Sequence, residues 1–291
     1  MNAKISRNAR LFAAGSLTAA VVALAFVPFN MGGCSASNLN IGSIVQGGGK
    51  LIAAGSLSEK DEQGLGEAVA VRATNTYPIY PDQNLNRYVT LVGRTVGAAS
   101  PEPKLKLYFA VLNTDKANAF SGPHGFIFIT RGAIRRMHDE SELAGVLGHE
   151  IGHVVKHHGL DAVKKAGYTD AFMTAAKGNV KQLEAFSNTT DALVDAAMNT
   201  GYGQPQEEQA DAEGVKYVIA AGYDPDGYLH FLQRLQQEQG AGGSPFGTHP
   251  GIKDRIKLVS EQIAKAHAGG QGQSLPERFH QYFAAATPLT R

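Results

Sequence analysis

Hydrophobic and polar positions divide the chain after residue 57 into helical and extended parts. Helical spacing begins near Ser58, a candidate N-cap that is followed by acidic residues and then by recurring small apolar ones. A second helix is predicted to begin at Asp82, which can cap it, and one apolar stripe follows: Leu85, Val89, Leu91, Val92 and Val96. The first part of the predicted domain is therefore two amphipathic helices.

The hydrophobic period then shortens. Residues 104–113 (KLKLYFAVLN) and 125–132 (GFIFITRG) are short and rich in β-branched and aromatic side chains, which predicts strands. Residues 114–125 between them have the composition of a loop, and beyond residue 132 the pattern is helical. These elements predict an α+β fold that is mainly helical, with a small sheet ahead of the later helices.

Composition and charge narrow the classes of function. The 291 residues are 43% hydrophobic and 18% charged, which is typical of a globular protein with one sizeable domain. The formal net charge is +1, so nothing indicates a basic surface for nucleic acid. One domain is predicted over residues 58–268. Glycine-rich stretches predict a linker before this domain and a flexible C-terminal tail over 269–291.

The N-terminus has the layout of a secretory signal, because three basic residues within the first ten precede an apolar run and then small residues. The only cysteine, Cys34, follows these in an arrangement that resembles a bacterial lipobox. Residues 1–33 are therefore predicted to be a lipoprotein signal peptide and 34–57 the lipidated cysteine with its linker. Ser35 after the cysteine favours sorting to the outer membrane. The alternative is an uncleaved transmembrane anchor with a chance cysteine, since the run is long enough to span a bilayer.

The stretch GVLGHEIGHVVKHH carries the candidate chemistry. His149 and His153 are four residues apart, so both rings project from one helix face and can grip one zinc ion. Glu150 is expected beside the metal rather than on it, where a carboxylate can take a proton from the attacking water. His157 and His158 are predicted to be ordinary helix-end residues, with His158 on the far side of the helix from His149.

A catalytic zinc needs a third protein ligand, and the stretch after Pro205 supplies a candidate. If a helix starts near Pro205, Glu207 and Asp211 share a face, one turn apart. Glu207 can ligate zinc, while Asp211 can accept the free N–H of a ligand histidine and fix its tautomer. The alternative for each carboxylate alone is a solvated helix face, which is the usual fate of Glu and Asp.

The segment NAFSGPHGFIFITRG through HEIGHVVKHH, then EEQAD and THPGIKDRI, resembles the HtpX-type zinc metallopeptidase family. The similarity covers roughly residues 58–266 and is closest to bacterial envelope lipoprotein members of the LoiP and BepA kind. The resemblance implies a gluzincin fold, and it matches five residues of this chain to roles: zinc ligands His149, His153 and Glu207, general base Glu150, and second-layer carboxylate Asp211.

Three further features are candidates for a role in substrate binding or catalysis. The strand in residues 124–130 resembles the edge strand on which such enzymes bind an extended substrate; the alternative is an internal strand. His249 is expected over the zinc as an oxyanion donor or as a plug in the resting enzyme, and Arg255 is expected to stabilise developing negative charge. Their alternatives are a helix start and an exposed helix arginine. The chain departs from the family at His124, where a glycine is common, and at Gln204, where an arginine is usual.

Together these features predict a zinc endopeptidase with one Zn²⁺ per chain, anchored by lipid to the periplasmic face of the outer membrane. The resemblance implies misfolded or unassembled envelope proteins as substrates, and hence protein quality control. One alternative is a zinc-containing, chaperone-like assembly factor with little proteolytic turnover. Another is a structural zinc site closed by His249 as a fourth ligand. Residues 160–200, which separate the predicted ligands, contain few large apolar side chains and are a candidate lid.

Overall fold

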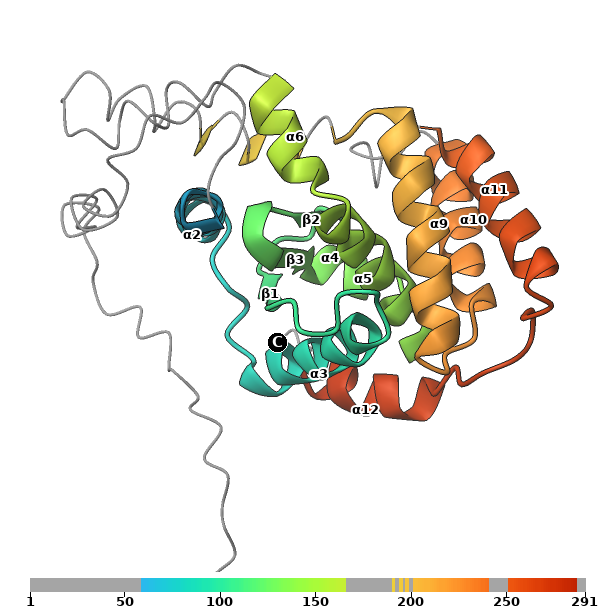
Figure 1. The fold of residues 1–291 in the computed structure, drawn as a ribbon. Coiled ribbons are helices and arrows are strands. Elements are labelled where there is room, and N and C mark those ends of the chain that lie inside the picture. Colours follow the sequence, from blue (N-terminus) through green and yellow to red (C-terminus); the bar gives the residue numbers. More distant parts are fainter. Residues whose placement is uncertain are drawn as a thin grey trace, which may run out of the picture. The chain divides into compact units, whose positions relative to one another are not determined.

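The computed structural model describes residues 59–165, 190–191, 194–195, 197–198, 201–240 and 251–286 (Figure 1). The predicted signal peptide, Cys34, the linker, His249 and most of the candidate lid lie outside these residues. The elements are α2 (Glu59–Thr76), α3 (Gln83–Ala98), β1 (Tyr108–Leu112), β2 (Ala119–Ser121), η2 (Pro123–Gly125), β3 (Phe126–Thr130), α4 (Arg131–Ile134), α5 (Glu140–Val155), α6 (His158–Lys165), α9 (Gln204–Ala220), α10 (Asp226–Gly240), α11 (Ile252–Lys265) and α12 (Pro276–Ala286). The predicted fold class, mainly helical with a small sheet, is confirmed. Among the described helices, none has both the length and the apolar content that crossing a bilayer requires.

Helix α3 shows which local signals suffice to set an element. The Asp82 carboxylate accepts a hydrogen bond from the backbone N–H of Leu85 at 2.9 Å, so the predicted cap is confirmed. Four members of the predicted apolar stripe are buried, but Leu91 is 53% exposed. Leu91 lies two positions after Val89, which is about 200° around the helix, so the two cannot share a face.

The three strands form one sheet in the order β1-β3-β2, with β3 parallel to β1 and antiparallel to β2. The strand predicted at the edge, residues 124–130, is therefore the central strand, and that prediction is wrong. The predicted loop 114–125 contains β2, whose three residues are too few to show a period. Strand order depends on pairing between segments that are distant in the sequence, and the local patterns of residues 114–125 and 124–130 do not encode this pairing.

Alternation along the strands divides the hydrophobic core into two clusters. Phe128 of β3 packs with Leu112 and Phe120 on the face of the sheet that α2 covers. Ile127 and Ile129 point to the opposite face and join the larger cluster, which includes α3 and α5. Full burial of each such side chain stabilises the fold by about 1.5–3 kcal/mol. The sheet thereby holds α5 against one of its faces.

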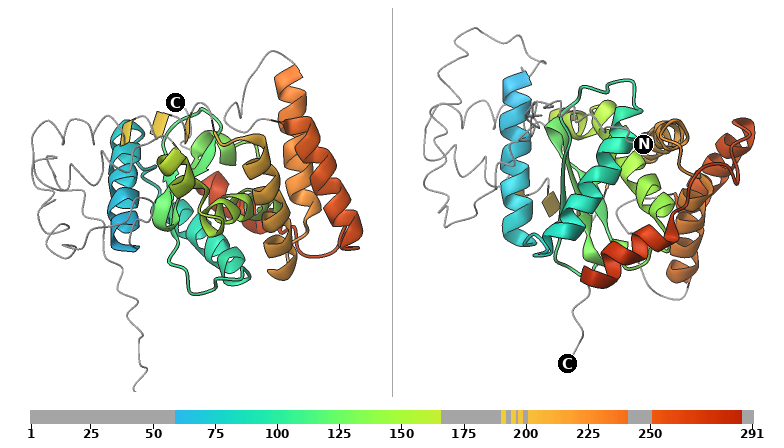
Figure 2. Two further views of the ribbon diagram at one scale, coloured as in Figure 1. Left: turned by 45° about the horizontal axis from the view of Figure 1, so that its top comes forward. Right: turned by 90° about the horizontal axis from the view of Figure 1, so that it is seen from below.

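The later helices pack around α5. Helix α9 lies along it, α10 contacts it, and α11 packs against α9 and α10 (Figures 1 and 2). Helix α12 packs against α3 and α5, with Phe279 fully buried and Tyr282 stacked on Tyr88. The predicted flexible tail is therefore wrong for residues 276–286, because the aromatic side chains of this segment complete the core.

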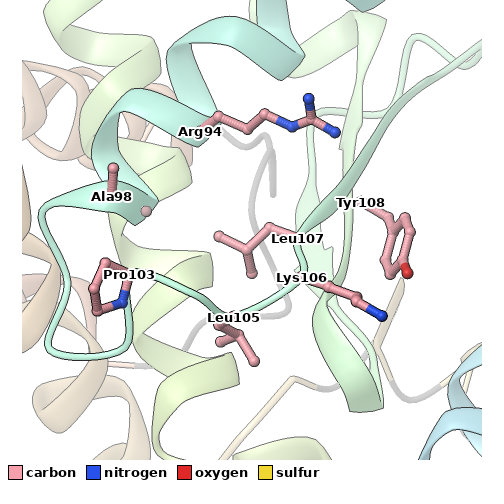
Figure 3. A pocket seen from close by; sticks show the side chains of 8 residues that line it. Arg94, Ala98, Pro103, Leu105, Lys106, Leu107 and Tyr108 are labelled. Atoms are coloured by element: carbon pink, nitrogen blue, oxygen red, sulfur yellow. The ribbon is translucent and has the colours of Figure 1, made fainter. Parts of the chain in front are cut away.

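A surface hollow lies between the end of α3 and the segment before β1 (Figure 3). Arg94, Lys106 and Tyr108 contribute polar groups to its lining. None of its lining residues belongs to the predicted metal-binding or catalytic set. The candidate chemistry lies instead where α5 meets α9.

Candidate metal centre

Helix α5 is fixed along its whole length. Every residue from Glu140 to Val155 is buried, and Asp139 caps the helix by accepting a hydrogen bond from the N–H of Glu142 at 3.0 Å. A helix enclosed in this way leaves its side chains little freedom of direction. The histidines in its second half are therefore held by the surrounding core.

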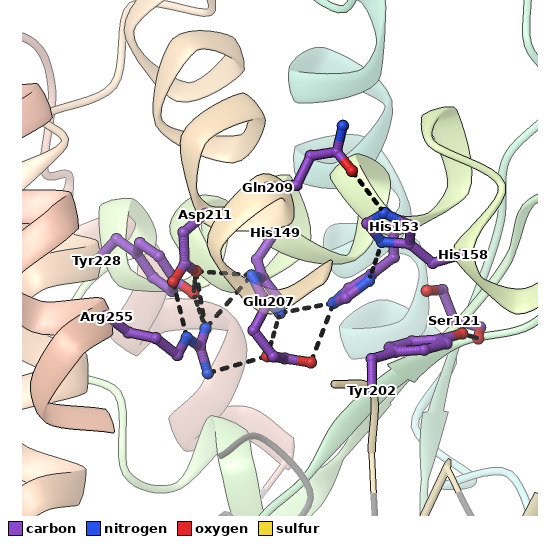
Figure 4. Close-up of polar contacts among 10 residues, drawn as sticks. All are labelled: Ser121, His149, His153, His158, Tyr202, Glu207, Gln209, Asp211, Tyr228 and Arg255. Carbon is purple, nitrogen blue, oxygen red and sulfur yellow. Dashed lines mark hydrogen bonds and ion pairs between the residues drawn. The ribbon is translucent and has the colours of Figure 1, made fainter. Parts of the chain in front are cut away.

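Two histidines and a carboxylate converge at the contact between α5 and α9 (Figure 4). The Nε2 atoms of His149 and His153 are 3.0 Å apart, and both side chains are buried. Helix α9 begins at Gln204, with Pro205 in its first turn as predicted, and brings Glu207 to them. Its Oε2 lies 3.4 Å from Nε2 of His149, and its Oε1 lies 3.5 Å from Nε2 of His153.

The spacing of these ligand atoms fits a zinc ion. Tetrahedral bonds of about 2.0–2.1 Å put neighbouring ligand atoms about 3.3 Å apart. The two imidazole nitrogens are 3.0 Å apart, and each lies near that value from a different oxygen of Glu207, at 3.4 Å for His149 and 3.5 Å for His153. All three residues are buried and can offer one ligand atom each to a common metal ion.

Glycines allow α9 to approach α5 closely enough for Glu207 to reach the histidines. A Cβ atom at Gly152 would lie 2.8 Å from the carbonyl oxygen of Ala210, and one at Gly214 would lie 2.8 Å from the backbone nitrogen of His149. Both obstacles are backbone atoms, which cannot swing aside as a flexible side chain can. Any larger residue at either position would push the two helices apart.

Asp211 lies behind the first histidine, as the sequence predicts. Its Oδ1 is 2.8 Å from Nδ1 of His149 and accepts a hydrogen bond from the Tyr228 hydroxyl at 2.7 Å. Arg255 donates to both carboxylate oxygens, from Nε at 2.7 Å and from a terminal nitrogen at 2.8 Å. Burial alone would raise the pKa of Asp211, but Arg255 and then His149 hold it well below its ordinary value. The carboxylate is therefore charged and accepts the Nδ1–H of His149.

The same surroundings favour a cation at His149. Burial and the nearby Arg255 lower its pKa, but Asp211 and Glu207 outweigh them and raise it to about 9. A proton satisfies this preference in the metal-free protein. A metal ion at Nε2 satisfies it equally, because it too brings positive charge to the ring.

Glu150 follows His149 in the chain and is fully buried. Its charge adds to burial in raising the pKa of Tyr202, whose ring stacks on His153 with 4.3 Å between the ring centroids. A small cavity beside Glu150 is lined by apolar side chains of α10: Phe231, Leu232 and Leu235. A carboxylate next to the metal ligands and an apolar cavity is suited to moving a proton to or from a bound substrate.

The prediction for His158 is wrong. Helix α5 ends at Val155 and His157 takes a left-handed conformation with φ of 55°, so the chain turns and α6 begins at His158. The turn brings Nδ1 of His158 within 2.7 Å of Nδ1 of His153. Nε2 of His158 lies 3.0 Å from Oε1 of Gln209 on α9. His157 itself is half exposed and does not reach the centre.

The structure brings Arg255 into the centre, and it is buried rather than exposed on its helix. His249 lies outside the described residues. Gln209 is not among the predicted site residues, because it lies two positions from both Glu207 and Asp211 and so about 200° around the helix from each. Tyr228 is not among them either, since no local signal exists for it and its role depends on how α10 packs against α5.

The two departures from the family pattern have local structural consequences. His124 adopts φ of 59°, in the left-handed region where glycine is free of the Cβ penalty. Gln204 lies on the surface at the start of α9 and donates hydrogen bonds to Glu208 and Asp254. Neither residue is one of the three convergent ligands.

Comparison with known proteins adds independent information about the chain. The model of peptidase family M48 matches residues 82–263. A putative beta-barrel assembly-enhancing protease of Vibrio cholerae is 27% identical over 215 residues, which cover 70% of this chain and 44% of that protein. The metalloprotease YcaL of Escherichia coli is 30% identical over 162 residues, 54% of this chain and 62% of its own length. The mitochondrial metalloendopeptidase OMA1 of Schizosaccharomyces pombe is 26% identical over 182 residues, covering 62% of this chain and 53% of that protein. The chain thus spans less than two thirds of each of these relatives.

Proposed function

Because the chain belongs to peptidase family M48, we propose that it is a zinc-dependent endopeptidase of the bacterial cell envelope. The observation that carries the proposal is the convergence of two buried imidazoles, His149 and His153, with the Glu207 carboxylate. The buried Glu150 beside them supplies a carboxylate that can act as a general base, which a purely structural metal site does not need. The proposed substrates are misfolded or unassembled envelope proteins, and the proposed role is protein quality control.

The residues of the centre divide the chemistry among them. His149, His153 and Glu207 hold the zinc, which when bound acts as a Lewis acid that polarises the scissile carbonyl and acidifies water. Glu150 takes the proton of the attacking water and later donates it to the leaving amine. Asp211 accepts the Nδ1–H of His149 and so leaves the Nε2 lone pair of that ring for the metal.

Arg255 holds the carboxylates of the centre in this proposal. It donates to both oxygens of Asp211, lies 3.2 Å from Oε2 of Glu207, and donates to the Tyr228 hydroxyl. The sequence predicts that Arg255 stabilises developing negative charge, but these contacts favour a role in positioning Asp211 and Glu207. His249 keeps its proposed role as an oxyanion donor or plug. A His249→Ala variant with unchanged cleavage rate and zinc affinity would remove that role.

The proposed location rests on the N-terminal sequence and on the relatives. The lipobox at Cys34 supports a lipid anchor, and Ser35 supports the periplasmic face of the outer membrane. Relatives named beta-barrel assembly-enhancing protease support a role in the envelope. Because the chain spans 44% of the Vibrio cholerae relative, the substrates and partners of that protein are carried over as proposals. Cys34→Ala is expected to abolish incorporation of a labelled fatty acid into the protein, whereas the alternative of an uncleaved transmembrane anchor expects no incorporation even in the wild type.

The proposed activity is tested by incubating the full chain in detergent with unfolded casein, beside Glu150→Gln at equal zinc content. Loss of the general base is expected to lower the cleavage rate by about 10²- to 10⁴-fold while zinc stays bound. If neither form cleaves casein, but both bind it and keep it soluble, the zinc-containing, chaperone-like assembly factor becomes the better account. Equal cleavage by both forms would show that Glu150 is not the base.

A further inference from the structure

The second ligand histidine is supported differently from the first. His149 has a carboxylate behind its Nδ1, whereas Nδ1 of His153 lies 2.7 Å from Nδ1 of His158 (Figure 4). Nε2 of His158 in turn lies 3.0 Å from Oε1 of Gln209. His153 and His158 are 0% and 5% exposed, so bulk water has little access to the contact between them, whereas Gln209 lies on the exposed side of α9. We refer to His153, His158 and Gln209 as the histidine relay.

Two directions of hydrogen bonding are self-consistent along the histidine relay. In the first, His153 donates from Nδ1 to Nδ1 of His158, and His158 donates from Nε2 to Oε1 of Gln209. In the second, every donor and acceptor is exchanged, with the Gln209 amide turned over so that its NH₂ group donates. The distances alone fit both directions.

A metal ion distinguishes the two directions. A neutral imidazole carries one ring proton, so in the second direction the proton of His153 lies on Nε2. That atom faces Nε2 of His149 and the Glu207 carboxylate, and a protonated nitrogen cannot ligate a metal. The first direction leaves the Nε2 lone pair of His153 free for the metal and is the one compatible with a zinc site.

We propose that His158 and Gln209 are positioning residues that fix the proton of His153 on Nδ1 and so keep its Nε2 atom as a metal ligand. The proposal deepens the proposed function, because it rests on the same zinc site. Neither residue touches the metal or the substrate. Their effect passes through the ring of His153.

The fold builds the relay from two local features. His157 takes the left-handed conformation that ends α5, and this turn returns His158 to the face of His153. Gln209 lies on the exposed side of α9, where its side-chain oxygen meets Nε2 of His158. Helix α9 thus supplies one ligand, Glu207, and one supporting group for each histidine, Asp211 directly for His149 and Gln209 through His158 for His153.

The test measures the zinc affinity of the folded, full-length chain in detergent by competition with a chromophoric chelator. His158→Leu removes the acceptor for His153 and is expected to weaken zinc binding about 10- to 100-fold, the usual effect of losing a group that supports a ligand. His158→Asn is expected to recover most of the affinity, because its side-chain oxygen can occupy the position of Nδ1 and accept the same bond. His157→Asn is the matched control, since asparagine tolerates the left-handed conformation, and it should bind zinc as the wild type does.

Gln209 tests the direction of the relay. Gln209→Glu can only accept a hydrogen bond, which enforces the direction that metal binding needs, so it should bind zinc at least as tightly as the wild type. Gln209→Leu removes the acceptor and should weaken binding. The absorption spectrum of the Co²⁺ form provides a second readout, because altered ligation of His153 shifts its d–d bands in the Leu variants and leaves those of Gln209→Glu in place.

The outcomes separate this proposal from the proposed function. If the wild type binds zinc and His149→Ala does not, but the Leu variants match the wild type, the relay is overturned and the metal site stands. Equal weakening by Gln209→Leu and Gln209→Glu would also overturn it, because it would indicate a packing role. If wild type and His149→Ala bind zinc equally weakly, the metal site itself fails. The Gln209 pair decides the question should His158→Leu fail to fold.

Discussion

Two buried carboxylates, Glu140 and Asp211, have similar surroundings, yet one lies in the candidate metal centre and the other does not. Glu140 accepts hydrogen bonds from the hydroxyls of Tyr88 at 2.7 Å and Tyr223 at 2.6 Å, and it is paired with Arg278. We call these four residues the Glu140 cluster. Asp211, with Tyr228, Arg255 and His149, forms the Asp211 cluster. Each cluster joins one carboxylate to tyrosine and arginine.

The difference between the clusters lies in what their partners can still do. The partners of Glu140 are two tyrosine hydroxyls and a guanidinium, all of which donate hydrogen bonds to the carboxylate. These bonds connect α3 and α12 to the start of α5. Asp211 has His149 among its partners, and the second ring nitrogen of that histidine faces His153 and Glu207. In this protein, a buried carboxylate paired with an arginine therefore occurs both with and without candidate metal ligands. The Asp211 cluster differs because one of its partners, His149, has a second ring nitrogen that lies beside the other candidate ligands.

The largest effect is expected from removing the third ligand. Loss of a residue that only supports a ligand weakens metal binding by up to roughly 100-fold. Glu207→Ala removes a ligand itself, so it should weaken zinc binding by more than this and abolish casein cleavage. Glu208→Ala, at the next position, is the matched control, because Glu208 contacts Gln204 on the surface rather than the histidines. Zinc affinity by chelator competition is the measurement. Tight zinc binding by Glu207→Ala would exclude Glu207 as a ligand.

Asp211→Asn and Glu140→Gln test the comparison directly, because each replaces a buried carboxylate with its amide. Asp211→Asn is expected to weaken zinc binding about 10- to 100-fold, since the amide no longer holds the Nδ1 proton of His149 with a charge. Glu140→Gln should leave zinc affinity within about twofold of wild type, because no member of its cluster reaches a ligand atom. The comparison breaks down if both substitutions weaken zinc binding alike.

Glu140→Gln is instead expected to act on stability. Loss of the charge leaves Arg278 with a weaker acceptor, and the free energy of unfolding should fall by about 1–3 kcal/mol. Glu102→Gln is the control, because Glu102 lies on the surface. Urea unfolding of the metal-free proteins at neutral pH measures the difference. An unchanged midpoint in Glu140→Gln would show that the cluster contributes nothing to the fold.

A smaller effect is expected in the pH dependence of stability. Burial raises the pKa of Glu140, but hydrogen bonds from Arg278, Tyr223 and Tyr88 lower it below 4.5, its ordinary value. An acid whose pKa is lowered in the folded state stabilises the fold above pH 4.5, and this contribution is lost as the pH falls below 4.5. The metal-free wild type should therefore lose more stability than Glu140→Gln between about pH 5 and pH 3. Parallel losses in the two proteins would contradict the lowered pKa.

Sequence alone predicts the parts of the molecule that depend on short-range spacing. The cap at Asp82 and the helix start near Pro205 are where the pattern puts them. Four-residue spacing on one helix placed His149 beside His153, and the same spacing placed Glu207 and Asp211 on one face of α9. The resemblance drawn from the motifs is confirmed at the level of the family by the match over residues 82–263.

Apart from Leu91, whose exposed position follows from helical spacing alone, the wrong predictions depend on contacts between distant segments or on one backbone angle. The central position of β3 depends on pairing with β1 and with β2, which is too short to be recognised alone. The tail prediction was wrong because glycines near residue 270 indicate a flexible joint but say nothing of a helix beyond it that buries Phe279. The relay was missed because a helix was assumed to continue through His157, where no glycine marks the left-handed turn.

The most direct test of the central claim is to remove zinc from the full chain and restore it while casein cleavage is followed. Cleavage is expected to stop on chelation and to return with one equivalent of zinc. Glu150→Gln is expected to rebind that equivalent without regaining cleavage, because its three ligands are intact and its base is absent. Cleavage that persists in the metal-free chain, or that returns in Glu150→Gln as it does in the wild type, would contradict the account.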